Sequence, residues 1–145
     1  MFADTGLDKS KRFYKPAATR QAFGRDEKRL VRESAVQISA RRHDKSTILD
    51  VSGDIDFANS VEVRQSLLRE IRGIRAPRVV VNLSQVRYMD SSGVASLVEG
   101  LKASRDLGSR FILFGLSPSV REVLQLSRLI KVFEVYDNEE QALAA

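Results

Sequence analysis

The sequence lacks cysteine entirely and has a single histidine, His43, among 145 residues. Without cysteine the chain can form neither a disulfide nor a thiolate nucleophile, which excludes disulfide-stabilised folds and cysteine-dependent catalysis. With one histidine, a transition-metal site built from Cys and His ligands is not expected, and only carboxylate metal sites stay open. His43 is most simply interpreted as an exposed turn residue.

Long apolar runs are missing as well. No stretch of about eighteen apolar residues is present, and the N-terminus has no charged and then apolar leader with a small-residue cleavage site. We therefore expect a cytoplasmic protein with neither a membrane span nor a secretory signal. A length of 145 residues with 43% hydrophobic content is enough for one domain with one packed core.

Motifs of catalysis and nucleotide binding are also absent. The patterns GxxxxGK and GxGxxG do not occur, and the segment FGLSPS lacks the second glycine of a G-x-S-x-G elbow. A serine nucleophile needs an oriented base, but His43 is far along the chain from Ser91. The sequence thus predicts no enzyme and no cofactor, with a hydrolase that uses Ser91 as the remaining enzymatic alternative.

The positive charge is concentrated at the N-terminus. The net charge is +5, and residues 1–33 carry nine Lys/Arg against five Asp/Glu, whereas the remaining residues carry fifteen against fourteen. We interpret 1–33 as a basic, flexible extension and 34–145 as the folded domain. The extension is either functionally silent or docks to an acidic protein, nucleic acid or membrane surface. Because it lacks interleaved aromatic and basic residues, we expect no direct nucleic-acid binding.

Strand and helix patterns alternate through residues 34–145. Apolar runs predict strands at 35–41, 46–53, 77–86, 110–115 and 131–136, and apolar residues at helical spacing predict helices within 54–74, 90–108, 117–130 and 137–145. The first two strands form a hairpin across a polar connection. A hairpin followed by alternating strands and helices indicates an α/β fold, with a mixed, mostly parallel β-sheet covered by amphipathic helices.

Local signals refine these elements. The strand at 77–86 is too continuously apolar to be half exposed, so it should be central and covered on both faces. Gly73 and Gly108 mark helix ends, and Ser117 before Pro118 marks a helix start. We expect six larger apolar side chains to pack together in one core: Val80, Leu83, Leu97, Leu101, Ile112 and Phe114.

The segment DSSG, Asp90 to Gly93, lies in the loop that leaves the predicted central strand and enters the next helix. Functional sites of α/β sheets usually lie at this edge, outside the carboxyl ends of the strands. Asp90, Ser91 and Ser92 can each accept hydrogen bonds from the first helical turn, and Gly93 leaves space beside the serines. A helix start alone explains these residue types. However, a phosphoryl group on a serine there would meet the positive end of the helix dipole and free amides, so the serine can also act as a switch.

Asp54 and Asp56, in the segment SGDIDF, are the second candidate site. Two carboxylates at this spacing can form an acid pair or bind a metal ion. More often such acids end a strand and cap the next helix, and Asp56 or Asn59 is the expected cap here. We therefore favour a structural role and predict no metal site.

Two segments together resemble the STAS domain, and specifically its anti-sigma factor antagonist branch. VSGDIDFANS, residues 51–60, is similar to the family's Gly-acid-apolar-Asp segment before the first helix, and YMDSSGVASLV, residues 88–98, is similar to its phosphorylation segment. The resemblance extends over residues 36–142. It implies the STAS fold for the folded domain.

The resemblance also implies a partner-switching regulator. Such a protein binds an anti-sigma factor that is also a serine kinase, and the kinase, which supplies ATP, phosphorylates Ser91 to end the binding. A phosphatase would restore it. The partner-binding surface that the resemblance implies comprises Gly53, Asp54, Asp56, Asp90, Ser91, Ser92 and Gly93.

One alternative stays open within the same family. A related chain with the same motif can be a non-switching STAS subunit or scaffold, bound to a transport ATPase or to a larger signalling assembly. The extension 1–33 is longer than is usual in stand-alone members and would suit such a tether.

Overall fold

The computed structural model describes residues 13–14 and 36–145. The rest of the predicted extension 1–33 lies outside the described residues, so its boundary and role stay predictions. Within the described part, the strands form one sheet in the order β1-β2-β3-β4-β5-β6. Their bounds are β1 Phe13–Tyr14, β2 Gln37–His43, β3 Ser46–Ser52, β4 Arg78–Gln85, β5 Arg110–Phe114 and β6 Glu134–Tyr136.

The sheet is mixed and mostly parallel, as predicted. β1, β2 and β3 pair antiparallel, and β3, β4, β5 and β6 pair parallel. The predicted hairpin is β2 and β3, joined at Asp44 and Lys45, where Asp44 takes a positive φ of 54°. β4 lies in the interior of the sheet, and its Val79, Val80 and Val81 are 0% exposed, which agrees with the prediction of a doubly covered strand.

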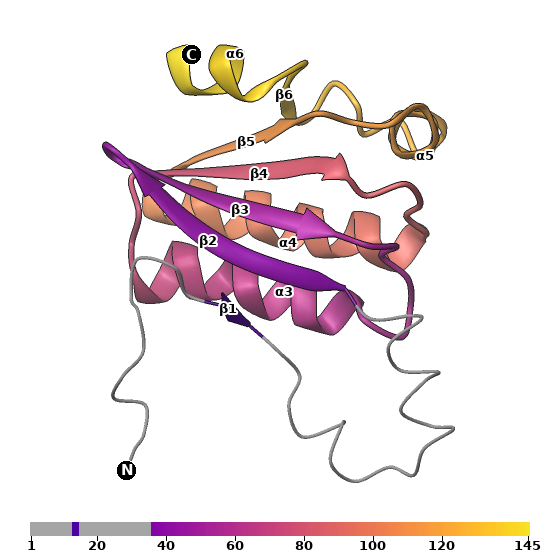
Figure 1. The fold of residues 1–145 in the computed structure, drawn as a ribbon, viewed down its shortest axis with the longest axis horizontal. Coiled ribbons are helices and arrows are strands. Elements are labelled where there is room, and N and C mark those ends of the chain that lie inside the picture. Colours follow the sequence, from indigo (N-terminus) through magenta and orange to yellow (C-terminus); the bar gives the residue numbers. More distant parts are fainter. Residues whose placement is uncertain (1–12, 15–35) are drawn as a thin grey trace, which may run out of the picture.

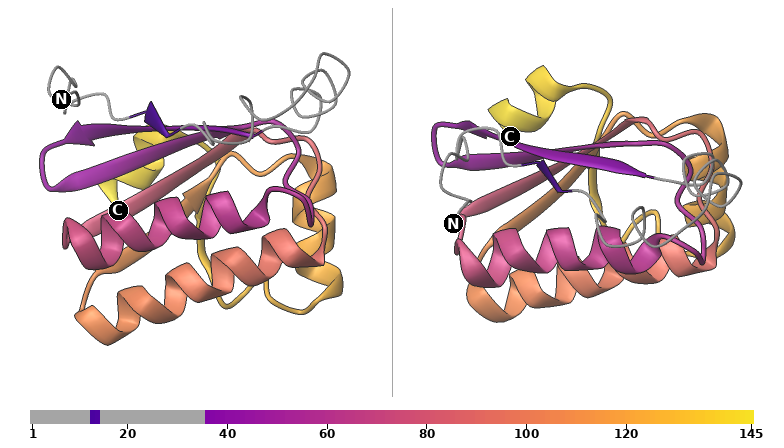
Figure 2. Two further views of the ribbon diagram at one scale, coloured as in Figure 1. Left: turned by 90° about the horizontal axis from the view of Figure 1, so that it is seen from below. Right: turned by 60° about the horizontal axis from the view of Figure 1, so that its bottom comes forward.

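Helices cover both faces of the sheet (Figure 1). Their bounds are α3 Ser60–Leu68, continued by the π-helix η3 Arg69–Gly73, then α4 Ser91–Leu107, α5 Pro118–Leu126 and α6 Glu139–Ala144. α3 and α4 lie side by side on one face, and α6 lies on the other (Figures 1 and 2). No described helix combines the length and the apolar character that crossing a membrane requires.

The apolar interior is divided by the sheet into two clusters. The larger cluster, beneath α3 and α4, contains Leu83, Leu97 and Leu101. The smaller one, beneath α6, is made of Ile48, Val80, Ile112, Phe114 and Ala142. The expectation that six residues are buried was correct, but the expectation of one shared core was wrong. Side chains alternate between the two faces of a strand, so neighbours such as Ile112 and Leu113 enter different clusters.

Most helix ends follow the predicted signals. Gly108 ends α4 with a φ of 72°, and the Ser117 side chain accepts a hydrogen bond from the amide of Val120. Gly73 ends the helical segment without a positive φ, and Arg75 takes that conformation instead, at 61°. Thus the left-handed turn lies two positions later than the glycine rule indicates.

α5 ends at Leu126, earlier than the predicted Ile130. The amides of Leu129 and Ile130 both donate to the carbonyl of Leu124, and Arg128 has a φ of 64°. The apolar residues after Leu126 therefore keep a helix-like spacing within a tight turn, which the periodicity alone cannot distinguish from a longer helix.

Candidate functional site

The two sequence motifs meet at the carboxyl ends of β3 and β4. After β3 the chain forms an isolated parallel bridge with the segment after β4, pairing Ile55 with Met89. The amide of Ile55 donates to the Tyr88 carbonyl at 2.9 Å, and the amide of Asp90 donates to the Ile55 carbonyl at 3.1 Å. We call this contact the Ile55–Met89 bridge. It brings the SGDIDF and DSSG segments side by side, as the resemblance implied.

The Asp90 carboxylate connects these two segments. Its Oδ1 accepts hydrogen bonds from the amides of Ser92 at 2.9 Å and Gly93 at 3.2 Å, which caps α4, and from the Ser92 hydroxyl at 2.5 Å. Its Oδ2 accepts from the amide of Phe57 at 3.0 Å. One side chain therefore fixes the start of α4 and the loop that leads to α3.

These hydrogen bonds give Asp90 a pH-dependent role in stability. Desolvation alone would raise the pKa of Asp90, but hydrogen bonds from Ser92, Gly93 and Phe57 outweigh it and hold the pKa below its usual value. The folded state thus binds the proton more weakly than the unfolded state. Its stabilising contribution is present above the unfolded pKa of about 3.9 and is lost as the pH falls through the lower folded pKa.

Replacing Asp90 by alanine is expected to lower the free energy of unfolding by about 1 kcal/mol at pH 7, the usual effect of removing a helix cap. The free energies of unfolding of the variant and of wild type should become more similar as the pH falls below about 4, because protonation of Asp90 then weakens the wild-type cap. Urea unfolding at pH 7, 5 and 3 measures both free energies. Asp54→Ala, which removes an exposed carboxylate from the adjoining segment, is the control for the loss of one negative charge. If the free energy of unfolding of Asp90→Ala differed from that of wild type by the same amount at all three pH values, this role would be contradicted.

The two serines of the motif differ in their surroundings. The Ser91 side chain is exposed, and none of the described residues forms a hydrogen bond with its hydroxyl, whereas the Ser92 hydroxyl is bonded to Asp90. The expectation of free amides beneath a phosphoryl group was wrong for Ser92 and Gly93, because the Asp90 carboxylate already accepts from both. The helix dipole remains available to a charge on Ser91.

Gly93 has a packing role that the sequence did not indicate. A Cβ atom built on Gly93 would lie 2.5 Å from Cγ of Met89 and 2.9 Å from Cγ2 of Ile55. Both of these side chains are fully buried. The absence of a side chain at Gly93 therefore lets the first turn of α4 rest directly on the Ile55–Met89 bridge.

The segment before α3 is shaped by its own polar groups. Gly53 has a φ of 101°, a conformation that favours glycine, and its amide donates to the carbonyl of Gln85. Oδ1 of Asp56 accepts from the amides of Ala58 and Asn59, so Asp56 caps the turn before α3 and not α3 itself, where the cap was expected. Asp54 is exposed.

Asn59, the other expected cap, has a different role. It occupies the N-cap position of α3 without a capping bond from its side chain. Its amide group instead donates to the carbonyl of Asp54 at 2.8 Å and accepts from the amide of Asp56 at 3.0 Å. No cluster of three His, Asp or Glu side chains suited to a metal ion is found in the described ranges.

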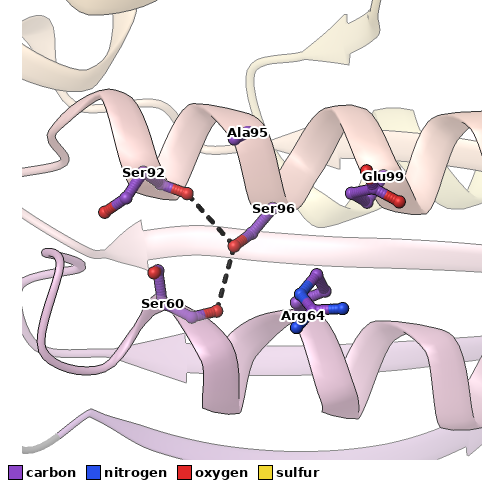
Figure 3. Close-up of a pocket in the computed structure, with 6 residues that line it drawn as sticks. All are labelled: Ser60, Arg64, Ser92, Ala95, Ser96 and Glu99. Atoms are coloured by element: carbon purple, nitrogen blue, oxygen red, sulfur yellow. Dashed lines mark hydrogen bonds between the residues drawn. The ribbon is translucent and has the colours of Figure 1, made fainter.

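A shallow groove between α3 and α4 lies next to this site (Figure 3). Its volume is about 290 Å³, and it is lined by Ser60, Arg64, Ser92, Ala95, Ser96 and Glu99. The Ser96 hydroxyl holds the two helices together by contacting the carbonyls of Ser60 at 2.9 Å and Ser92 at 3.2 Å. This groove was not predicted from the sequence, although α4 carries small residues at helical spacing, such as Gly93, Ser96 and Gly100, which allow a neighbouring helix to approach closely.

Phe57 is a second feature that the sequence analysis missed. It lies between Asp56 and Asn59, in the turn before α3, and 83% of it is exposed. Tyr88, on the adjoining segment, is 47% exposed. The sequence signal for an exposed Phe57 was that this aromatic residue lies in a loop and does not fit the apolar periodicity of the neighbouring strand or helix.

Known proteins share both the sequence pattern and the fold. A family model described as STAS domain matches residues 37–142. The chain is 30% identical over 108 residues to the anti-sigma F factor antagonist of Paenibacillus polymyxa, covering 74% of this chain and 92% of the relative. It is 29% identical over 102 residues to the anti-sigma-B factor antagonist of Listeria monocytogenes, covering 70% and 87%. A crystal structure of an anti-sigma factor antagonist from Mycobacterium paratuberculosis matches with a TM-score of 0.68 and 25% identity, covering 77% of this chain and 93% of that one.

Proposed function

The chain belongs to the STAS domain family, and from this premise we propose that it is an anti-sigma factor antagonist switched off by phosphorylation of Ser91. The similarity to two named antagonists supports the antagonist function. These relatives are regulatory proteins and not enzymes, in agreement with the expectation that this chain is not an enzyme. A protein with this function works in the cytoplasm, where sigma factors act.

The exposed hydroxyl of Ser91 carries the phosphorylation part of the proposal. Ser91 is the exposed first residue of α4, and its hydroxyl has no hydrogen-bond partner among the described residues, while the neighbouring Asp90 and Ser92 side chains are bonded to each other. A kinase can therefore reach Ser91 without breaking a described contact of the fold. The added charge of about −1.5 to −2 would sit at the positive end of the helix dipole, so the domain itself tolerates it.

The effect of the phosphoryl group falls on the partner. It would lie on the proposed partner-binding surface, with Gly53, Asp54 and Asp56 as the proposed adjoining rim. An anti-sigma factor that fits the unmodified surface would have to desolvate that charge or place its own groups against it. The kinase, which binds ATP as the phosphoryl donor, is then the same anti-sigma factor that phosphorylated Ser91 no longer binds. A phosphatase that removes the phosphoryl group restores the binding.

Phosphorylation by an anti-sigma factor kinase of the source organism tests this proposal. With ATP, we expect one phosphoryl group on the wild-type chain and on Ser92→Ala, and none on Ser91→Ala, as measured by intact mass and peptide mapping. Ser92→Ala is the matched control, because it removes the neighbouring hydroxyl. Modification of Ser92 in place of Ser91 would contradict the assignment.

Binding of the unphosphorylated variants is the second arm. Ser91→Glu is expected to bind the kinase at least roughly 30-fold more weakly than wild type, the scale of an unpaired charge forced into an interface, whereas Ser91→Ala should bind as wild type does. Titration calorimetry measures both. If Ser91→Glu bound as tightly as wild type, the switch would be wrong. Recovery of a transport ATPase and no such kinase in a pull-down would favour the non-switching subunit.

A further inference from the structure

We propose that Phe57 is the apolar anchor of the contact with the anti-sigma factor, and that its ring enters an apolar pocket of that partner beside Ser91. The inference rests on the proposed function and adds to it a residue that determines affinity. It also gives a physical reason why a charge on Ser91 ends the binding.

Phe57 contributes little to the folded domain through its ring. At 83%, it is the most exposed of the large hydrophobic side chains in the described ranges. Leu126, at the end of α5, comes next at 76%. An exposed aromatic ring in a loop near a functional site has apolar area that only a partner can remove from water.

The backbone around Phe57 is already held in place. Its amide donates to Oδ2 of Asp90, and the next two amides, of Ala58 and Asn59, donate to Oδ1 of Asp56. The backbone of residues 57–59 is thus held by two carboxylates. A residue presented in this way loses little conformational freedom on binding, which is what distinguishes an anchor from a mobile apolar side chain.

Asp90 also ties Phe57 to the phosphorylation site. The carboxylate that accepts from Phe57 is the one that caps α4 at Ser92 and Gly93, next to Ser91. Tyr88 adjoins the same place, because its carbonyl accepts from Ile55 across the Ile55–Met89 bridge. Aromatic residues are enriched in the cores of protein interfaces, so two exposed aromatic side chains on these adjoining segments favour a partner pocket of apolar character.

The polar groove begins at Ser92, the residue after Ser91. Ser92 is bonded to Asp90 and also lines the groove, whose walls carry Arg64 and Glu99 (Figure 3). A partner that contacts both Phe57 and the groove would lie close to Ser91, because Ser91 lies in the sequence between Asp90, which is bonded to Phe57, and Ser92, which lines the groove. A phosphoryl group on Ser91 would then have to lose its water next to a buried ring, which is strongly unfavourable.

Titration of Phe57→Ala with the kinase that modifies Ser91 tests the anchor. We expect binding at least roughly 30-fold weaker than wild type, the usual loss for a dominant aromatic contact, and a partial recovery in Phe57→Leu. Leu126→Ala is the matched control, an equally exposed apolar residue elsewhere, and should bind within about twofold of wild type. In phosphorylation assays, Phe57→Ala should raise KM and leave kcat unchanged, because the ring only binds.

Three outcomes separate this inference from the proposed function. If Ser91→Glu loses binding in the same titration but Phe57→Ala does not, the anchor is wrong and the switch stands. If neither variant changes binding, or if no anti-sigma factor kinase modifies Ser91, both fall. If Phe57→Ala lowers the melting temperature by several degrees, the ring has a structural role and the anchor assignment is overturned.

Discussion

Replacing Gly93 by alanine is expected to lower the free energy of unfolding by about 1–3 kcal/mol, the usual effect of overfilling a packed interior. The new Cβ would lie 2.5 Å from Cγ of Met89 and 2.9 Å from Cγ2 of Ile55, closer than nonbonded carbon atoms approach. Both neighbours are fully buried, so neither side chain can swing into solvent to make room. Urea unfolding measures the loss.

The chain provides a matched control for this substitution. Gly73 also lies in a helical segment, but the nearest atom to its added Cβ is Cγ of Arg69, at 4.0 Å. Gly73→Ala should therefore be neutral or stabilising by up to about 1 kcal/mol, because alanine loses less backbone entropy than glycine. Equal stability of the two variants would show that α4 does not press on the Ile55–Met89 bridge.

Truncation of Leu113 is the second large effect. Leu113→Ala is expected to cost about 2–5 kcal/mol, because the side chain is fully buried in the larger cluster beneath α3 and α4. A cavity there is enclosed by the sheet and two packed helices, which have little freedom to collapse into it. The expected cost is at the upper end of the range.

Its neighbour Ile112 provides the comparison. Ile112→Ala removes a similar side chain from the same strand, but from the smaller cluster covered by α6, residues Glu139–Ala144. This short helix is able to shift, so the loss should be at the lower end of about 2–5 kcal/mol. Chemical denaturation of both variants measures the difference. A larger loss for Ile112→Ala would contradict the division of the interior described above.

The sequence was sufficient to predict the layer architecture. The β2–β3 hairpin, the doubly buried β4 and the helix starts at Asp90 and Ser117 all follow from local patterns, because period, capping and turn chemistry act over a few residues. The end of α5 and the left-handed residue Arg75 could not be predicted in this way. There the backbone follows hydrogen bonds formed in the turns, and apolar spacing does not report them.

The division of the apolar interior into two clusters could not be predicted from the sequence for a different reason. Val80 and Ile112 look like any other buried residue in the sequence, and their face depends on the register of parallel neighbours. Register is set by long-range pairing, which one sequence does not reveal. The expectation of a single core combined residues that the sheet keeps apart.

The sequence does not distinguish the structural roles of the residues in the candidate site. From sequence, Asp90, Ser91 and Ser92 were equivalent candidates for a cap. The structure distinguishes them, because Asp90 accepts the capping bonds, Ser92 donates to Asp90 and Ser91 stays exposed. The link from Asp90 to Phe57 joins two segments far apart in the chain, and no local rule predicts it.

The short turn between β2 and β3 affects the order in which the parts of the chain fold. Because only Asp44 and Lys45 separate the two strands, this hairpin closes a small loop and can form within about 10 microseconds. The parallel pairs β3–β4 and β4–β5 have to close longer loops that contain α3 and α4, which is slower. The junction of Ile55 with Met89 depends on the parallel pair. A newly made chain is therefore expected to bring Ser91 and Phe57 together only after the parallel strands β3 and β4 have paired, and so later than the hairpin forms.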